Sequence, residues 1–424
     1  MAAPILDDLR WRGLIANSTD AAALAAALDA GPITFYCGFD PTAPSLHFGN
    51  LVQLVTMRRF QQAGHRPIAV VGGATGLVGD PSGKSAERSL NEVEVVEAWV
   101  ERIRAQIGHL LDFAGDNPAR IANNLDWTRD LSTIAFLRDI GKHFSVARML
   151  EKEAVAARVS DEGISFTEFS YQILQAMDYL ELYRRHGCVL QTGGSDQWGN
   201  LTAGVDLIRR VERASVHALA TPLVTRSDGT KYGKTESGAV FLDPEMTSPF
   251  AFYQYFLNQA DADVVALLKV FSFRSPEAID ELARAVEERP EAREAQRVLA
   301  EELTAMVHGA DEAARAQAAS EAVFGSGDLA TVDERTLAAA VADLPQATVN
   351  AAAPSVLDLL VATGLASSRS DARRTLAEGG AYVNNERVTD PGWVPGEAAF
   401  LHGRWLVLRR GKRRLAIAAR ADLR

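Results

Sequence analysis

The sequence has few cysteines, no long apolar run and no metal-binding pattern. Only 2 of its 424 residues are cysteine, Cys37 and Cys188, which argues against a disulfide scaffold or a zinc knuckle. The 8 histidines never form HExxH or a paired Cys/His set, so we expect no structural metal. No apolar stretch approaches a membrane span, and the first residues lack the basic-then-apolar order of a signal peptide. We therefore expect a cytoplasmic protein with no membrane contact.

The charge is unevenly distributed along the chain. The net charge of -11, taken over the whole chain, argues against a nucleic-acid partner. Residues 354–424, however, hold 12 Lys and Arg against 7 Asp and Glu, a net of +5, which leaves -16 for residues 1–353. This asymmetry predicts a basic appendage on an acidic body. The length predicts two or three domains.

The first part of the chain alternates strand-like and helix-like segments. Residues 33–39, 66–76 and 187–194 are apolar runs that end near glycine, and helical patterns follow them, including residues 91–113. This alternation predicts a parallel α/β sheet, whose ligands bind outside the carboxyl ends of the strands. We expect this domain to span 1–247.

The second part of the chain loses its strand signals. Helical patterns fill residues 248–324, which we expect to form a helical domain. Residues 325–353 have no long periodicity and predict a linker. Residues 354–424 predict a small α+β domain with two short helices, and then two strands joined by a turn at Asn384-Asn385.

Three polar motifs in the α/β region are each weak when taken alone. "HFGN" (47–50) places His47 and Asn50 on one face at a helix start, where donors suit phosphate oxygens, although a capping contact explains them equally well. "KYGKT" (231–235) is a cationic loop or simply a solvated one. The glycine-rich segment 71–85 lacks the spacing of a Walker A loop, and a flexible surface loop is its plainer interpretation.

A polar face on an otherwise apolar helix is more informative. Tyr171, Gln175 and Asp178 recur at i, i+4 and i+7. Burying Asp and Gln without partners costs about 1–3 kcal/mol each, so a polar ligand would have to supply the partners. The alternative is a solvent-facing polar stripe.

Together these segments resemble a known family. "YCGFDPTAPSLHFGN", "GGATGLVGDPSGK", "SFTEFSYQILQAMDY", "QTGGSDQWGN" and "DGTKYGKTESG" are similar, in order and spacing, to the signatures of bacterial tyrosyl-tRNA synthetases. These are class I aminoacyl-tRNA synthetases, in which HFGN stands in the place of HIGH and KYGKT in that of KMSKS. The resemblance covers nearly the whole chain and implies a Rossmann-like catalytic domain, with an S4-like RNA-binding domain at 354–424.

The resemblance implies a two-step reaction without a covalent enzyme intermediate. The carboxylate of tyrosine attacks the α-phosphorus of ATP, which is bound with Mg²⁺, and a ribose hydroxyl of tRNA(Tyr) then takes the tyrosine. The implied catalytic residues are Thr42, His47, Asn50, Lys231, Lys234 and Thr235. Asn50 departs from the family, which has a second His there, so a role that needs positive charge at this position is in doubt. Phe48 and Tyr232 also depart from the signatures and are interpreted as packing positions.

The resemblance also implies the binding residues. The expected tyrosine site consists of Tyr36 and Asp178 for the phenol, Asp80, Tyr171 and Gln175 for the ammonium, and Gln197. The expected ATP contacts are Cys37, Gly38, Asp40, His47, Gly49, Gly194, Asp196 and Lys234. The expected RNA contacts are Arg369, Arg373, Arg374, Arg409, Arg410, Lys412, Arg413 and Arg414.

Other interpretations stay open. A tryptophanyl-tRNA synthetase has the same fold, other nucleotidyl transferases share the HIGH signature, and a regulatory RNA-binding protein could have lost catalysis. By resemblance we expect a homodimer, with residues 131–150 either at its interface or in the interior. We also expect a chain that ends near Ala353 to fold and to activate tyrosine.

Overall fold

The computed structural model forms two compact units. It describes residues 4–82, 91–151, 155, 163–230, 232–235, 238–325, 327–349, 354–411 and 414–421. One unit comprises Met1–Met246 and Ala260–Ala295, and the other comprises Thr247–Gln259 and Gln296–Arg424. No helix within the described residues is both long enough and apolar enough to cross a membrane.

The first unit is built on a six-stranded sheet in the order β1-β6-β5-β2-β3-β4. Its strands are β1 (Asn17–Ser18), β2 (Thr34–Phe39), β3 (Arg66–Val71), β4 (Arg120–Asn123), β5 (Cys188–Gly194) and β6 (His217–Thr221). Every pair is parallel except that of β1 with β6, which confirms the predicted parallel sheet. The chain runs outward from β2 through β3 and β4, and from β5 through β6 in the other direction. The topological switch point, where such sheets bind ligands, therefore lies between β2 and β5.

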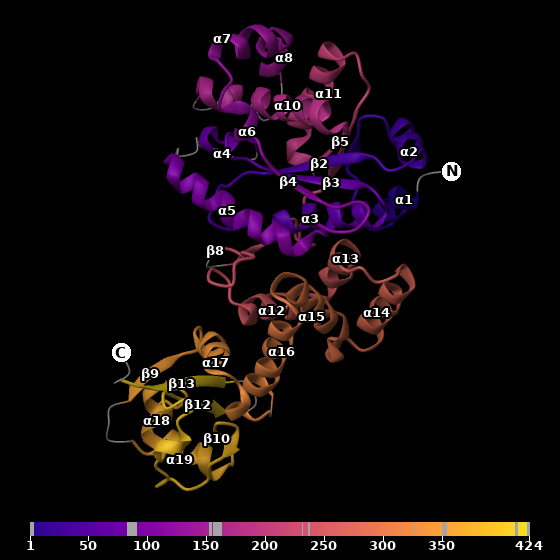
Figure 1. Ribbon diagram of the computed structural model, residues 1–424. Coiled ribbons are helices and arrows are strands. Elements are labelled where there is room, and N and C mark those ends of the chain that lie inside the picture. Colours follow the sequence, from indigo (N-terminus) through magenta and orange to yellow (C-terminus); the bar gives the residue numbers. More distant parts are fainter. Residues whose placement is uncertain are drawn as a thin grey trace. The chain divides into compact units, whose positions relative to one another are not determined.

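Helices cover both faces of this sheet, with α3 and α5 on one face and α10 and α11 on the other (Figure 1). Because both faces are covered, the strands are continuous apolar runs rather than alternating ones. The helices up to residue 211 are α1 (Pro4–Trp11), α2 (Ala21–Asp29), α3 (Phe48–Gln62), α4 (Thr75–Val78), α5 (Val93–Leu110), α6 (Leu125–Thr128), α7 (Thr133–Ala135), α8 (Val146–Leu150), α10 (Phe166–His186) and α11 (Trp198–Val211). A π-helical turn spans Phe136–Ile140. A small hairpin pairs β7 (Lys234–Thr235) with β8 (Gly238–Ala239).

Two helices from the expected helical domain belong to the first unit. They are α13 (Asp261–Phe271) and α14 (Pro276–Glu288). Buried guanidinium groups fix the end of α13, since Arg12 and Arg59 both donate hydrogen bonds to the carbonyl of Ser272, at 2.9 and 2.6 Å. Residues 248–324 are thus divided between the two units rather than forming one separate helical body.

The second unit combines helices with a five-stranded sheet in the order β11-β10-β12-β13-β9. The strands are β9 (Gln346–Val349), β10 (Ala381–Val383), β11 (Glu386–Arg387), β12 (Trp405–Arg410) and β13 (Arg414–Arg420). The helices are α12 (Pro249–Leu257), most of α15 (Glu294–His308), α16 (Ala310–Phe324), α17 (Glu334–Val341), α18 (Val356–Ala362) and α19 (Arg369–Ala377). Asn384 and Asn385 join β10 to β11 with φ of 49° and 67°, which confirms the predicted turn.

The segment 325–353, which we expected to be a linker, contains structure that belongs to the C-terminal sheet. It holds α17 and β9, and β9 pairs in parallel with β13. One face of the sheet packs on α18 and α19, and the other packs on α16 and α17 through Val323, Leu337, Val407 and Ile417. The short alternating pattern of four strand residues gave too weak a signal to separate β9 from a loop. The sheet and these helices therefore share one core.

A chain that ends at Ala353 is now expected to be destabilised, contrary to the sequence-based expectation. The cut would keep α17 and β9 but remove β12 and β13, so the apolar side chains of α16 and α17 would face water. Thermal unfolding of this truncated chain should show a weaker transition at lower temperature than that of the full chain, and it should bind a hydrophobic dye. A truncated chain that melts like the full one and binds no dye would contradict the shared core.

Candidate functional site

Several predicted site residues meet at the carboxyl edge of the first sheet. Asp40 directly follows β2, Gly72 follows β3, Asn124 follows β4 and Asp196 follows β5. Parallel strands end at one edge, so residues far apart in sequence come together there. Helix α3 begins after the turn that follows β2, and α10 lies on the opposite face of the sheet (Figure 1).

The start of α3 is held by a reciprocal capping box. The His47 backbone N–H donates to Asn50 Oδ1 and the Gly49 N–H donates to His47 Nδ1, each at 3.0 Å. The capping contact, which we considered as the alternative to phosphate binding, is therefore present in the structure. The caps use Nδ1 of the imidazole and the amide oxygen, so Nε2–H and Nδ2–H₂ are the groups chemically suited to donate to a ligand. A Cβ on Gly49 would come within 2.8 Å of the His47 ring, which explains a glycine inside this helix.

The HFGN and KYGKT segments lie together. The Phe48 N–H donates to the Val240 carbonyl at 2.9 Å, just after the β7–β8 hairpin. The Phe48 ring lies 6.3 Å from that of Tyr232 and 4.6 Å from that of Phe271. Phe48 and Tyr232 are both buried, which confirms that they are packing positions. One aromatic cluster therefore joins the helix start, the loop and α13.

Some predicted catalytic residues lie beyond what the structure describes. Lys231 falls outside the described residues, and only the backbone of Lys234 and Thr235 is described, in β7. Thr42 is exposed in the turn after β2, where its N–H donates to the Asp40 carbonyl at 2.9 Å.

Asp178 is a buried carboxyl with two protein donors. The Asn124 amide donates to Oδ2 at 3.0 Å and the Trp127 indole N–H donates to Oδ1 at 2.8 Å. Burial raises the pKa of Asp178 to about 7, although these two hydrogen bonds oppose the shift. The polar face of α10 is therefore buried, and the solvent-facing alternative is wrong for Asp178 and Tyr171.

Tyr36 places a buried hydroxyl near this carboxyl. Its side chain on β2 is 1% exposed, and its hydroxyl has no hydrogen-bond partner within the described part of the chain. Burial, and next the negative charge of Asp178, raise the pKa of Tyr36 well above its usual value. A buried hydroxyl without a partner is costly, so it marks a place where a ligand can bind.

A second set of contacts surrounds Asp40. The Tyr171 hydroxyl donates to Asp40 Oδ2 at 2.5 Å and the Thr75 hydroxyl donates to Oδ1 at 2.6 Å. Thr75 in turn accepts from the Asn124 amide at 2.9 Å, so Asp40 and Asp178 are linked through two residues. A Cβ on Gly72 would come within 2.1 Å of Asp40 Oδ1, which requires glycine there.

Asp80 and Gln197 form the third set. The Gln197 amide donates to Asp80 Oδ2 at 2.7 Å and the Ser82 N–H donates to Oδ1 at 2.9 Å. Asn200 donates to Gln197 Oε1 at 2.9 Å and so fixes the orientation of that amide. Gln175 is half-buried on α10.

The predicted nucleotide-binding residues have different surroundings. Gly38 and Asp196 are exposed, and a Cβ on Gly194 would come within 2.5 Å of Asp196 Oδ1. Cys37 is buried, and its thiol lies 3.8 Å from the Gln53 side-chain oxygen on α3. Burial raises the pKa of Cys37 to about 12, so the thiol stays protonated.

Sequence reasoning missed three residues of this site, namely Thr75, Asn124 and Trp127. All three bond to Asp40 or Asp178 or to one another. The pair Asn123-Asn124 at the end of an apolar run was the available signal, because polar residues after a parallel strand point to the ligand edge. The run 120–123 was too short to be recognised as a strand.

Two known protein families match this chain. The family described as "tRNA synthetases class I (W and Y)" matches residues 28–325, and "Tyrosine--tRNA ligase SYY-like C-terminal domain" matches residues 336–418. The protein belongs to the class I aminoacyl-tRNA synthetases. The synthetase is 64% identical to the Tyrosine--tRNA ligase of Streptomyces avermitilis over 97% of this chain and 98% of that protein. It is 57% identical to that of Mycobacterium tuberculosis over 98% and 99% of the two chains.

Solved structures agree with the fold of this synthetase. A C-terminally truncated Aspergillus nidulans mitochondrial tyrosyl-tRNA synthetase superimposes with a TM-score of 0.68 at 29% identity, covering 74% of this chain and 92% of that one. A tryptophanyl-tRNA synthetase from Encephalitozoon cuniculi has a TM-score of 0.54 at 14% identity, covering 78% and 89%, and shows the shared fold alone.

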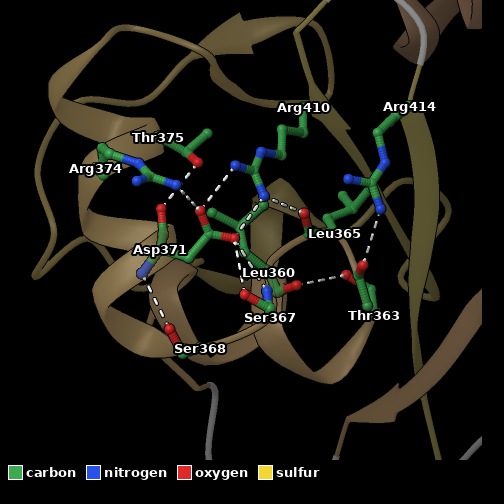
Figure 2. A network of polar contacts seen from close by, with 11 residues as sticks. Leu360, Thr363, Leu365, Ser367, Ser368, Asp371, Arg374, Thr375, Arg410 and Arg414 are labelled. Carbon is green, nitrogen blue, oxygen red and sulfur yellow. Dashed lines mark hydrogen bonds and ion pairs between the residues drawn. The ribbon is translucent and has the colours of Figure 1, made fainter.

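In the C-terminal sheet domain, some arginines that were predicted to bind RNA are bonded to acidic residues of the synthetase itself. Asp371 on α19 accepts two hydrogen bonds from Arg410 and one from Arg374, at 2.7 to 2.9 Å (Figure 2). These bonds hold the pKa of Asp371 well below its usual range. Arg369 pairs likewise with Asp358 on α18.

The other predicted RNA-binding residues are arranged differently. Arg373 is exposed and has no hydrogen bond or ion pair within the described residues, whereas Arg414 donates to the carbonyl of Gly364 at 3.2 Å. Arg409 lies over Tyr382. Lys412 and Arg413 fall outside the described residues.

The Asp371–Arg410 pair is expected to stabilise the domain rather than to bind RNA. Arg410→Gln should lower the melting temperature by a few degrees at neutral pH, because it removes a two-bond ion pair between α19 and β12. The loss should shrink in acid: Asp371 has a depressed pKa, so its contribution is present above the unfolded-state pKa and disappears as the pH falls through the folded-state value. Melting curves of Arg410→Gln and Arg373→Gln as a function of pH test this, and equal effects of the two would contradict it.

Proposed function

We propose that this synthetase charges tRNA(Tyr) with tyrosine at the carboxyl edge of its first sheet. The relatives named Tyrosine--tRNA ligase, matched over nearly full length, support the reaction. Two observations carry the amino-acid assignment. The Tyr36 hydroxyl has no hydrogen-bond partner within the described residues, and the buried Asp178 carboxyl lies near enough for its charge to raise the pKa of Tyr36. A phenol hydroxyl can accept from one and donate to the other, whereas an indole N–H has only a proton to donate.

The tyrosine ammonium and the nucleotide would bind on either side of this pair. Asp80, Tyr171 and Gln175 would face the ammonium, with Gln197 holding Asp80 in orientation. The Asp40 carboxyl, already fixed by Tyr171 and Thr75, would lie between the amino acid and the ribose of ATP. Cys37, Gly38, Gly49, Gly194 and Asp196 would line the nucleotide side, with Cys37 acting through its backbone because its thiol is buried.

The first chemical step would need no enzyme nucleophile. The substrate carboxylate attacks the α-phosphorus and pyrophosphate leaves, so positioning and charge neutralisation supply the catalysis. His47 and Asn50 would donate to phosphate oxygens through Nε2 and Nδ2, with Thr42 beside them. Lys231, Lys234 and Thr235 would bring positive charge and a hydroxyl to the same phosphates, because the hairpin that carries two of them packs against the start of α3.

Magnesium would arrive with ATP. No group of His, Cys, Asp and Glu within the described residues is arranged to hold a metal ion. Magnesium ions often keep several waters and bind through substrate phosphates, which suits a site of this kind. We place the protein in the cytoplasm, where its tRNA substrate is charged; its two cysteines are free and buried.

A homodimer is part of the proposal. Segment 131–150 contains apolar side chains that face outward, with Ile134 70%, Leu137 50% and Val146 60% exposed. Ile140 and Met149 of the same segment are buried, so it is anchored on one side only. An exposed apolar strip of this kind suits a symmetric contact with a second copy.

The whole assignment is tested by ATP–pyrophosphate exchange with each of the twenty amino acids, followed by charging of tRNA. Only tyrosine should support both reactions at low concentration. Exchange with tryptophan alone would identify the sister enzyme, and exchange with no amino acid would leave an RNA-binding protein without catalysis.

Tyr36→Phe should reduce the selection of tyrosine over phenylalanine. Removing one hydrogen bond to the substrate hydroxyl is expected to lower the ratio of kcat/KM for the two amino acids by about tenfold. Asp178→Ala should reduce this ratio too. Val70→Ala, a buried apolar change in the same cluster, serves as a control for general loosening and should lower both rates together. An unchanged ratio in both site variants would contradict the assignment.

The pKa of Asp178 also predicts a pH dependence of this ratio. Above about pH 7 the carboxylate is ionised, and a bound phenylalanine would leave that buried charge with only the donors from Asn124 and Trp127, whereas tyrosine adds a third donor. Below this pH the carboxyl is neutral and the penalty on phenylalanine disappears. The tyrosine-to-phenylalanine ratio should therefore rise from about pH 6 to about pH 8, by at most about tenfold per pH unit. In Asp178→Asn the tyrosine-to-phenylalanine ratio should not change with pH.

Asn50→Asp should separate the capping role of this residue from its ligand role. Aspartate keeps the oxygen that accepts from His47 and so preserves the helix start, but it replaces the amide donor with a negative charge near the phosphates. We expect an unchanged melting temperature and a rate of adenylate formation reduced by roughly a hundredfold, with little change in tyrosine affinity. Asn50→His should reduce the rate of adenylate formation only slightly, and Lys234→Ala should reduce it about as much as Asn50→Asp does. A fall in stability without a fall in rate would assign Asn50 to capping alone.

A further inference from the structure

Helix α13 contacts both signature segments of the proposed active site. Its last residue, Phe271, places its ring 4.6 Å from that of Phe48 in HFGN. Its first turn carries Asp263, whose carboxyl accepts a hydrogen bond from the backbone N–H of Ser227 at 2.8 Å. Ser227 lies shortly before KYGKT in the sequence. All of these residues belong to the first unit, so one helix connects two segments that are far apart along the chain.

Asp263 is a buried acidic residue that serves the loop rather than its own helix. Its side chain is 8% exposed, and burying a carboxyl is costly unless it is hydrogen-bonded. The positive end of the helix dipole favours an acidic group in the first turn, but the N-cap residue of α13 is Ala260, which makes no side-chain cap. Within the described residues Asp263 has one side-chain hydrogen bond, and that bond goes to Ser227.

The hydrogen bond holds a tight turn that leads into KYGKT. The Gly229 N–H donates to the Arg226 carbonyl at 2.9 Å and closes the turn, in which Ser227 is the second residue. The Tyr232 N–H, inside KYGKT, donates to the Val224 carbonyl at 3.1 Å. The turn and Tyr232 are thus parts of one hydrogen-bonded loop. Holding Ser227 therefore restricts the backbone that leads into KYGKT.

The far end of α13 is fixed by two buried arginines. Arg12, which directly follows α1, donates to the carbonyls of Lys269, Ser272 and Arg274 at 2.9 to 3.0 Å. Arg59 on α3 also donates to the Ser272 carbonyl, at 2.6 Å. Cations at the end of a helix satisfy carbonyls that have no partner inside it. Because Arg59 belongs to the helix that begins beside HFGN, α13 keeps a fixed position relative to that helix.

We propose that Asp263 is a positioning residue for tyrosine activation, which sets the place of the KYGKT loop relative to the start of α3. Helix α13 is the spacer, because one end is bonded to α3 and the other end holds the loop. The proposal rests on the proposed function, in which Lys231 and Lys234 bring positive charge to phosphates that the start of α3 also contacts. Charge neutralisation in a transition state depends on exact placement. A looser loop therefore slows adenylate formation and leaves tyrosine binding intact.

The test measures tyrosyl-adenylate formation by the full-length protein in single turnovers, with separate titrations of tyrosine and ATP. Asp263→Ala should reduce the rate constant at saturating substrates about tenfold, as expected for one lost hydrogen bond, and should change the tyrosine dissociation constant less than about twofold. Asp261→Ala is the matched control, because it removes the same formal charge from the same turn at an exposed position. It should change the rate less than about twofold. Equal rate losses in the two variants, or a parallel loss of tyrosine affinity in Asp263→Ala, would assign Asp263 a structural role only.

Ser227 variants test the same hydrogen bond from the loop side, without a change in α13. Ser227→Pro removes the N–H, and proline suits the second position of a tight turn. It should slow adenylate formation about as much as Asp263→Ala does, whereas Ser227→Ala, which keeps the N–H, should slow it less than about twofold. Equal rates in the two Ser227 variants would overturn the contact, and this comparison remains decisive even if Asp263→Ala does not fold.

A background that lacks both loop lysines separates this proposal from the proposed function. In the Lys231→Ala, Lys234→Ala protein, adding Asp263→Ala should slow adenylate formation less than about twofold, because the charges that Asp263 positions are already gone. A further tenfold loss there would show that Asp263 acts independently of the loop, and the proposal would be wrong. If removing the lysines slows the reaction and Asp263→Ala does not, the proposal is overturned and the proposed function stands. If removing the lysines has no effect, the proposed role of the loop and this proposal are both overturned.

Discussion

The capping hydrogen bonds at the start of α3 fix the geometry on which the site depends. They orient His47 and Asn50, and they hold the first turn of the helix in place beside the switch point between β2 and β5. Phe48, directly after the cap, connects that turn by its backbone to Val240 and by its ring to Tyr232 and Phe271. A shift of this one turn would move the two signature segments and α13 together. His47 and Asn50 can therefore serve both in capping and in ligand binding. Nδ1 of His47 and Oδ1 of Asn50 cap the helix, whereas Nε2 and Nδ2 are suited to donate to a ligand.

The buried polar groups of the proposed amino-acid site favour substrate selection, but they lower the stability of the folded protein. Asp178 carries a raised pKa, so its ionisation opposes folding, and that cost grows as the pH rises from the unfolded-state value of about 4 to about 7. The donors from Asn124 and Trp127 reduce the cost without removing it. Tyr36 adds a buried hydroxyl that has no hydrogen-bond partner among the residues that the structure describes. The Asp178 carboxylate and the Tyr36 hydroxyl gain hydrogen bonds only from a ligand whose polar group matches them. This gain is the physical origin of the proposed selectivity for tyrosine.

Much of the fold could be predicted from the sequence, and the limits have physical causes. The strands at 34–39, 66–71 and 188–194 are apolar because both faces of the sheet are covered, and the Asn384-Asn385 turn needs residues that tolerate positive φ. By contrast, β9 is stabilised by pairing with β13 across a long separation in sequence, and a four-residue segment carries little signal of such pairing. Motif order predicted most of the candidate site residues, whereas Asn124 and Trp127 became visible only in the structure, where both donate to Asp178.

The basic tail shows why a count of charges does not define a binding surface. Arg409 and Arg410 are adjacent residues of the same type, yet they point to opposite faces of β12. Arg410 bonds to Asp371, whereas Arg409 lies over Tyr382. A charge that is already paired inside the domain contributes to folding, whereas an unpaired charge held by an aromatic ring keeps its attraction for a partner. The same rule applies to the Tyr36 hydroxyl in the first unit. That hydroxyl has no hydrogen-bond partner among the described residues, and it therefore marks a place where a substrate would complete the set of hydrogen bonds.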